Sequence, residues 1–470
     1  NGILFTQNRE NNSFFFSKSA GSAYDVKVDR FNLGSFVANS SLGEVDGTMS
    51  VSGEAFSFSK ILFNDISGNI NRFDLMNYAY SNIKVDKGTF KNNIFYANVS
   101  INDPNVTLDF VGGIDLNGSQ NMSFEANLSE AVLDRLGFTN TPSSLATTMK
   151  VDMTGTNPNN YEGNVFVDCF SYVENGKEIN VPMMTLDITR SEAIDSFTVT
   201  SDIADIGIQG KIDFDYVWMH INDEMSEILP AIYTESRENL EHHLEDFFAF
   251  QVDLKDANDF LNIFAPSLKI SSGTTLRGDY SAVNTEFNAR VNAAALEYKD
   301  MVFTDVFLNQ TIESDKLNLT YHVDEFKYND SLSFNDLYFT TIGGNNDLVS
   351  EFSWDQETPN ASTIKWETYA KDVDHFNFLI QPSYFSIKER KWEITDASNF
   401  KIKADTIQVE KFLLKRNDQS IKLWGQISKQ DNDQLNYDIK NLQLDEISEF
   451  VTDAVNLEGE LISYGYIANP

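Results

Sequence analysis

An alternation of apolar and polar residues recurs along most of this chain and constrains its fold more than any other feature. Tyr24, Val26 and Val28 show it early, and it is clearest over residues 206–216. Successive side chains of an extended strand point to opposite faces, so alternation gathers the apolar side chains on one face. The sequence therefore predicts a sheet with one apolar face and one solvated face.

Short stretches rich in asparagine, glycine and aspartate separate the alternating runs. Examples are Asn117-Gly118, Asn175-Gly176 and residues 343–347 and 416–418. These residue types suit tight reversals, so most connections are expected to be antiparallel hairpins. The 9 prolines form no Pro-rich linker. We expect an all-β fold, elongated and mostly antiparallel, in which one curled sheet forms an apolar trough and the few helices are short.

Four short segments have helical rather than strand character. Residues 129–136 open with Ser129 as a candidate N-cap, and a longer patch covers residues 235–248. Residues 257–264 continue that patch, and a last segment covers residues 445–451. Each helix is expected to close one end of the trough or to bridge two parts of the sheet.

A weak internal repeat marks four places, at residues 47–53, 149–155, 273–278 and 459–465. The irregular spacing predicts one sheet extended by repeating units rather than a strict short-period solenoid. The expected sections are a groove section over residues 1–140, a second over 141–270 with a helical insertion near 235–264, a third over 271–455, and the start of a further, truncated repeat over 456–470.

The charge balance argues against one class of function. The chain has 71 acidic and 35 basic side chains and a formal charge of −36. This charge repels polyanions, so nucleic-acid binding is not expected. Aromatic residues nevertheless make up 13% of the chain, which is too much apolar surface for a disordered acidic protein. The chain must therefore fold so as to gather a large apolar surface.

No group of residues has the spacing of a catalytic or metal site. His242 and His243 are adjacent, and neighbouring side chains on a helix point about 100° apart, which does not suit one shared metal. Cys169 has no histidine near it in sequence and is interpreted as a small strand residue. There is no Gly-rich phosphate loop and no Gly-x-Ser-x-Gly motif. We expect no enzyme activity, no metal and no cofactor.

Paired carboxylates are the remaining candidates for chemistry. Asp213 and Asp215, or Asp431 and Asp433, could in principle act in glycoside cleavage or bind calcium. In so acidic a chain such pairs arise by chance, and no EF-hand spacing is present. We interpret them as charge on the solvated face.

Short glycine and aromatic motifs carry a resemblance to a known family. They occur at residues 42–47 (Leu-Gly-Glu-Val-Asp-Gly), at 77–83 (Asn-Tyr-Ala-Tyr-Ser-Asn-Ile) and at 103–112, where Asp-Pro-Asn precedes Leu-Asp-Phe-Val-Gly. Residues 254–270 add Leu-Lys-Asp-Ala-Asn and Phe-Ala-Pro-Ser-Leu-Lys-Ile. In these motifs the chain resembles the TamB proteins (translocation and assembly module) of the AsmA-like superfamily, in the form found in Bacteroidota.

The resemblance implies a periplasmic protein whose sheet curls into an apolar groove, a β-taco. Such proteins are similar to bridge-like lipid transfer proteins, which carry phospholipid between membranes, here in outer-membrane biogenesis. The implied partners are phospholipid, the inner membrane through an N-terminal helix missing from this chain, and an outer-membrane barrel of the Omp85 family similar to TamA or TamL. The chain would be a middle section of such a protein.

The alternating residues themselves are the candidates for a lipid-lining face. Exposing a 16-carbon acyl chain to water at about 0.8 kcal/mol per CH₂ costs on the order of 10 kcal/mol, and a continuous apolar face removes that cost. The expected lining residues are Val106, Leu108, Phe110, Ile206, Ile208, Ile212, Phe214, Leu317, Leu319, Tyr321, Leu435, Tyr437 and Ile439.

A second interpretation fits the same alternation. A β-solenoid or adhesin-like structural or interaction protein would have an apolar face that is simply its filled core, and apolar strand faces are usually core. The period of the sequence does not distinguish a face that lines an open groove from one that is buried.

Overall fold

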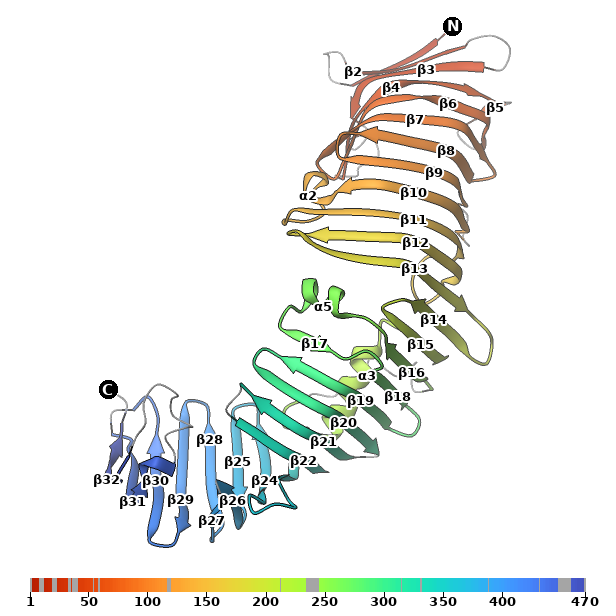
Figure 1. Cartoon of the computed structure of the whole chain (residues 1–470). Coiled ribbons are helices and arrows are strands. Elements are labelled where there is room, and N and C mark those ends of the chain that lie inside the picture. Colours follow the sequence, from red (N-terminus) through yellow and green to blue (C-terminus); the bar gives the residue numbers. More distant parts are fainter. Residues whose placement is uncertain are drawn as a thin grey trace. The chain divides into compact units, whose positions relative to one another are not determined.

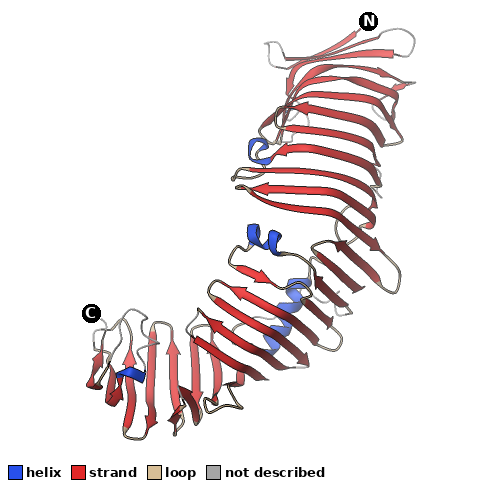
Figure 2. Ribbon diagram, in the orientation of Figure 1, coloured by secondary structure: helices blue, strands red, loops and turns tan. Residues whose placement is uncertain are grey.

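The structure is a computed structural model that describes residues 2–7, 12–18, 23–32, 35, 41–53, 55–57, 60–115, 120–211, 213–233, 245–313, 315–329, 332–387, 389–430, 432–446 and 458–468. Strands account for most of these residues (Figure 2). The described helices are the short α2 (Leu133–Leu136), α3 (Val217–Ile228), α5 (Asn258–Phe264) and a 3₁₀ turn, η1 (Leu444–Glu446). None of them is long and apolar enough to cross a membrane. The predicted all-β class is confirmed.

The chain folds as two compact units. Unit 1 comprises Asn1–Gly207 and Asp256–Ala265, and unit 2 comprises Ile208–Lys255 and Pro266–Pro470. Strand β15 (Ala204–Lys211) contains the boundary. This boundary lies inside the section expected over residues 141–270, because packing between neighbouring strands, not sequence repetition, defines the units.

In unit 1 each strand from β1 to β4, and from β6 to β14, pairs antiparallel with the next (Figure 1). The short β5 pairs with β6, which also pairs with β4. The strands are β1 (Gly2–Gln7), β2 (Asn12–Lys18), β3 (Ala23–Asn32), β4 (Leu42–Ser52), β5 (Ala55–Ser57), β6 (Lys60–Leu75), β7 (Tyr78–Lys91), β8 (Ile94–Asp103), β9 (Val106–Asp115), β10 (Met122–Val132), β11 (Ser143–Thr154), β12 (Glu162–Glu174), β13 (Lys177–Thr189) and β14 (Asp195–Ser201).

Unit 2 is also antiparallel. At its beginning β16 pairs with β18 and β17 with β19, and from β18 to β25 each strand pairs with the next. Later in the chain β25 pairs with β28, and from β28 to β32 each strand pairs with the next. Strands β26 and β27 form a hairpin in which β26 pairs with β24 and β27 pairs with β29. The strands are β16 (Phe247–Leu254), β17 (Leu268–Ile270), β18 (Thr275–Ser281), β19 (Glu286–Tyr298), β20 (Met301–Glu313), β21 (Lys316–Tyr328), β22 (Leu332–Gly344), β23 (Asp347–Trp354), β24 (Ser362–Asp372), β25 (His375–Ile380), β26 (Ser383–Ile387), β27 (Arg390–Ile394), β28 (Ser398–Lys403), β29 (Thr406–Arg416), β30 (Gln419–Ile427), β31 (Leu435–Gln443) and β32 (Glu460–Ile467).

The predicted turn residues form the hairpins where they are described. Asn175 and Gly176 join β12 to β13 with φ of 50° and 79°, and Asn345 and Asn346 join β22 to β23 with φ of 51° and 71°. Positive φ at both central residues matches the right-handed twist of the flanking strands. The turn expected at Asn117-Gly118 lies outside the described residues.

A line of bends curls the sheet of unit 2. Pairing between β20 and β21 skips Asp305 and Asp324, and pairing between β21 and β22 skips Asp324 and Asp336. Asp305 and Asp336 have φ of 50° and 51°, a left-handed conformation that aspartate tolerates better than most residues. Inside the bend the strands close on a buried cluster whose members are Ala293, Val306, Val323 and Leu337.

Two expected helices differ in extent from the observed elements. β10 continues to Val132, which pairs with Ser144 of β11, so only the last four residues of the segment 129–136 are helical and Ser129 caps nothing. Pairing with a neighbouring strand satisfies this backbone better than a short isolated helix would. At the end of the chain, η1 replaces the start of the helix expected over 445–451, and residues 447–451 lie outside the described part.

The central helical region is also placed differently. The segment expected over 257–264 is confirmed as α5. Of the patch expected over 235–248, residues 235–244 are outside the described part, and Phe247 and Phe248 begin β16. The strand expected to run through Phe214 and Tyr216 is wrong, because β15 ends at Lys211 and a turn leads into α3.

Candidate functional site

One face of the sheet in unit 1, which we call inner face 1, is apolar from β2 to β13. Its central row consists of directly opposed residues, each paired with the next across neighbouring strands. The row is Phe16, Val26, Met49, Gly68, Val85, Val99, Phe110, Ala126, Met149, Val167 and Met184. Paired residues share a face, so this row crosses the sheet without a polar side chain.

Two further rows widen inner face 1. The first is Val28, Gly47, Ile70, Ile83, Ile101, Leu108 and Leu128. The second is Ala97, Gly112, Phe124, Val151, Val165, Leu186 and Val199. Neighbouring strands lie about 4.8 Å apart, so each row is a series of closely spaced apolar steps.

Inner face 1 is partly open to solvent. Val85 and Val167 are buried, but Met49, Phe110 and Met149 are only half-buried. The described strands of unit 1, apart from the short β5, are hydrogen-bonded side by side in one sheet. A conventional β-sandwich core would instead be covered by another sheet about 10 Å away.

The opposite face of the same strands is polar. Lys84, Asp109, Glu125 and Lys150 alternate with inner-face residues and are exposed. Lys150 Nζ lies 3.0 Å from Glu125 Oε1 across the β10–β11 pair. This face is solvated, as the alternation predicts.

Unit 2 has a corresponding apolar face, which we call inner face 2. Its central row runs from β16 to β24, and every member is half-buried. The row is Val252, Leu276, Val291, Leu308, Tyr321, Phe339, Phe352 and Ile364. A neighbouring row contains Leu319 but also Gln310, Thr341 and Ser350, so inner face 2 is less uniform. The hydroxyls of Thr341 and Ser350 satisfy each other at 2.9 Å.

The structure distributes the thirteen candidate lining residues over both units. Most are half-buried residues of an apolar sheet face, and Val106 is buried at 7% exposure. Ile212 lies outside the described residues, and Phe214 lies in the turn before α3, not on a strand. The others lie on β9 (Val106, Leu108, Phe110), on β15 (Ile206, Ile208), on β21 (Leu317, Leu319, Tyr321) and on β31 (Leu435, Tyr437, Ile439).

Helix α3 packs on inner face 2, and the sequence analysis missed it. Its residue His220 is buried at 2% exposure and bonds the hydroxyl of Tyr280, an inner-face residue of β18, at 2.9 Å. The available signal was the helical spacing of Val217, Ile221 and Met225. This helical spacing begins directly after an alternating run, so the change from the strand period to the helix period is hard to recognise in the sequence.

Those candidates for chemistry that the structure describes form no site. Asp213 Oδ1 accepts the backbone N–H of Asp215 at 3.0 Å, so this pair makes a turn. Cys169 is exposed, and its hydrogen bond with Asp168 raises the pKa of the thiol, which lowers its reactivity. The described residues contain no group of three or more His, Cys, Asp and Glu side chains that could hold a metal. Both His242 and His243 are outside the described part.

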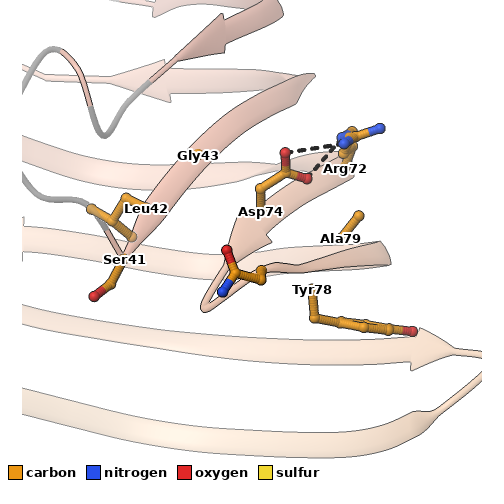
Figure 3. A pocket seen from close by; sticks show the side chains of 8 residues that line it. Ser41, Leu42, Gly43, Arg72, Asp74, Tyr78 and Ala79 are labelled. Carbon is orange, nitrogen blue, oxygen red and sulfur yellow. Dashed lines mark hydrogen bonds and ion pairs between the residues drawn. The ribbon is translucent and has the colours of Figure 1, made fainter. Parts of the chain in front are cut away.

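A small pocket at the ends of β4, β6 and β7 is polar and filled by an internal ion pair (Figure 3). Arg72 donates from Nε and Nη2 to the two carboxylate oxygens of Asp74 at 2.8 and 3.0 Å. This hydrogen bond and the charge of Asp74 raise the pKa of Arg72. The pocket is lined by Ser41, Leu42, Gly43, Arg72, Asp74, Asn77, Tyr78 and Ala79. Its charges are matched within the protein, which favours a structural role.

The extended apolar faces are therefore the strongest candidate for a functional surface. They offer area and continuity rather than directed polar groups, which suits the binding of acyl chains. Comparisons of the chain with protein-family models, curated proteins and solved structures found no match.

Proposed function

We propose that the inner faces hold the acyl chains of phospholipid and that the protein transfers lipid rather than catalysing a reaction. The observation that supports this most strongly is the central row of inner face 1. It has an apolar side chain or glycine on each of the strands β2–β4 and β6–β13, and much of it is only half-buried although water contact is costly for such side chains.

The energetics favour a continuous surface of this kind. At about 0.8 kcal/mol per CH₂, an acyl chain of 16 carbons gains on the order of 10 kcal/mol by leaving water. A lipid that moves from one strand to the next along a row keeps this gain, because the next apolar side chain is about 4.8 Å away. Acyl chains need area rather than directed hydrogen bonds, so low selectivity among lipids is expected.

The motif resemblance suggests the cellular setting. We propose that the chain is a TamB-like protein of the AsmA-like superfamily that acts in the periplasm between the inner and outer membranes. The proposed partners are phospholipid, the inner membrane and an outer-membrane barrel of the Omp85 family. The solvated, acidic outer face would keep such a protein from adhering to anionic surfaces along its length.

The alternative is an interaction protein with a filled core. The fully buried cluster at the bend of unit 2, where Val323 is 0% exposed, is the feature that fits it best. The half-buried central row beside that cluster fits it less well, because a filled core would bury both to the same degree.

A vesicle-to-vesicle phospholipid transfer assay with matched variants separates the two functions. Leu128 and Asn127 are consecutive residues of β10, with Leu128 on inner face 1 and Asn127 exposed on the opposite face. Leu128→Asp places a carboxylate in the lipid path, and Asn127→Asp adds the same charge outside it. We expect transfer to fall at least tenfold in Leu128→Asp and to stay within twofold of wild type in Asn127→Asp.

Two results would overturn the proposal. One is transfer at the wild-type rate in folded Leu128→Asp. The other is a wild-type protein that neither transfers phospholipid nor yields any lipid to mass spectrometry after organic extraction.

A further inference from the structure

Helix α3 lies across the strands of unit 2, along one rim of inner face 2. Near its first turn His220 bonds Tyr280 of β18, and at its end the N–H of Asn346 in the β22–β23 turn donates to the carbonyl of Ile228 at 2.9 Å. The 12 residues of α3 span about 18 Å, and β18 to β22 are four strand spacings, about 19 Å. The helix therefore follows the same direction as the apolar rows.

The helix covers a specific part of inner face 2, which we call the rim row. Tyr280 and Ile312 in this row are buried, at 4% and 1% exposure, whereas Phe287, Leu317 and Leu348 are half-buried like the central row of inner face 2. The rim row consists of Tyr280, Phe287, Ile312, Leu317, Gly343 and Leu348. Helix α3 thus occupies apolar surface that elsewhere in the sheet is partly open.

Specific contacts fix both ends of α3. The ring of His220 lies between the Tyr280 hydroxyl and Asp246, with Nε2 3.0 Å from Asp246 Oδ2. At the other end, Asn346 Oδ1 accepts the N–H of Ala231 at 2.8 Å.

The helix has little stability of its own. No side chain caps its N-terminus, its first turn has no acidic residue, and its last turn has no basic residue. Glu224 and Glu227 lie in its C-terminal half, where the helix dipole disfavours negative charge. An isolated helix of 12 residues is marginal in water. Its conformation therefore depends on its contacts with the sheet.

One of those contacts involves a buried acid. Glu224 lies one turn after His220, on the side of α3 that faces the sheet, and is 5% exposed. No hydrogen bond joins its carboxyl to any residue that the structure describes. Burial, together with the charges of Glu227 and Asp223, raises its pKa to about 7. Among the residues that the structure describes, the other titratable groups near it are His220 and, across the interface, Tyr280 and Asp246.

From this geometry we infer that α3 is a protonation-sensitive lid on inner face 2, held over the rim row by neutral Glu224 and released when Glu224 ionises. Released, α3 would expose the rim row. The role of the lid in lipid transfer rests on the proposed function, whereas the pH-dependent opening of the lid does not depend on that function.

The sign of the pH dependence follows from the two states of Glu224. In the closed lid its pKa is about 7, and in the open, solvated state it returns to the ordinary 4.5. The closed state then binds more protons, so raising the pH favours opening. These values give an increase in the opening constant of about tenfold from pH 6 to pH 8.

Amide hydrogen exchange of residues 217–228 at pH 6, 7 and 8, corrected for the intrinsic exchange rate, tests the lid without lipid. We expect the opening constant of the wild type to rise about tenfold across this range. In Glu224→Gln, whose side chain stays neutral, it should be constant. Asn346→Gly removes the hydrogen bond from the Ala231 N–H to the Asn346 side chain, and glycine accepts the φ of 71° at this position. The opening constant of α3 should therefore rise about fivefold at every pH.

The proposal is overturned if the exchange of α3 in the wild type does not depend on pH. It is also overturned if Glu224→Gln keeps the wild-type pH dependence, because a group other than Glu224 would then cause it. An Asn346→Gly variant with unchanged exchange would also contradict it. Lipid transfer measured at pH 6 and pH 8 is a separate result. If the protein transfers no lipid although α3 opens with pH as expected, the proposed function alone is refuted. If the transfer rate does not change with pH although α3 opens, only the role of the lid in lipid transfer is refuted.

Discussion

Two carboxylates placed on one strand distinguish an open apolar face from a filled core. Leu319 and Val323 lie four residues apart on β21 and point to the same face. Leu319 is half-buried, whereas Val323 is 0% exposed within the cluster at the bend. Leu319→Asp and Val323→Asp thus introduce the same charge at two depths of one surface.

The expected costs differ by several kcal/mol. A half-buried leucine contributes about 1 kcal/mol of burial, and water reaches the new carboxylate at Leu319, so Leu319→Asp should cost about 1–2 kcal/mol. Val323→Asp loses about 1.5 kcal/mol of burial and also places an unpaired carboxyl in an apolar cluster, for a total of about 4–5 kcal/mol. Domain stabilities are about 5–15 kcal/mol, so only the second change threatens folding.

Urea unfolding followed by tryptophan fluorescence and by circular dichroism measures both changes. We expect Leu319→Asp to keep its strand content and protease resistance and to lose lipid transfer, and Val323→Asp to unfold at much lower urea. Leu108→Asp on β9 should behave as Leu319→Asp does. Equal and large destabilisation by Leu319→Asp and Val323→Asp would show that the rows are a filled core and would refute the reasoning.

Three further predictions concern stability. Burial of Asp103 favours its neutral form, but hydrogen bonds from Tyr78 and neighbouring residues outweigh this and lower its pKa. Asp103→Asn should therefore cost about 2 kcal/mol in urea unfolding at pH 7. This difference in stability should shrink as the pH falls below about 4, where the carboxyl of the unfolded chain protonates, and through the lower pKa of the folded state. Asp195→Asn breaks a largely buried pair with Arg190 (2.9 Å) and should cost about 3 kcal/mol, nearly independent of salt. Gly176→Ala, at φ of 79°, should lower stability by about 1 kcal/mol in thermal unfolding; an unchanged midpoint in any of the three variants would contradict its premise.

Alternation and turn chemistry were sufficient to predict the class of the fold. The alternating runs that fold as strands place their apolar residues on one face, because side-chain direction in a strand is a local property. The Asn175-Gly176 turn and the short helix at residues 257–264 also follow from local sequence. These features need no knowledge of what lies beside them.

The rows of the inner faces could not be predicted in the same way. A row exists only if each strand adopts the right register with its neighbours, and a shift of one residue would move an apolar set to the other face. Bends such as those at Asp305 and Asp336 depend on this pairing too, since nothing local distinguishes these aspartates from others on the solvated face.

Helix α3 shows where local reasoning gave a wrong result. The alternation that ends at Lys211 was extended through Phe214 to Tyr216, although the Asp213 side chain reverses the backbone there. An aspartate that accepts a backbone N–H two residues later is a recognised turn signal. The burial of Glu224 was beyond sequence analysis, because an acidic residue in so acidic a chain is expected to be exposed.

Photo-crosslinking at two phenylalanines tests the central claim most directly. Phe124 lies half-buried on inner face 1, and Phe166 lies on the opposite face of the same sheet at 39% exposure. Each is replaced by benzoylphenylalanine, so the probe, the parent residue and the surrounding sheet are matched. The protein is irradiated with phospholipid vesicles, and covalent lipid is detected by mass spectrometry. We predict phospholipid adducts at position 124 and none above background at position 166. Equal labelling at both positions, or none at position 124, would contradict a lipid path along the inner face.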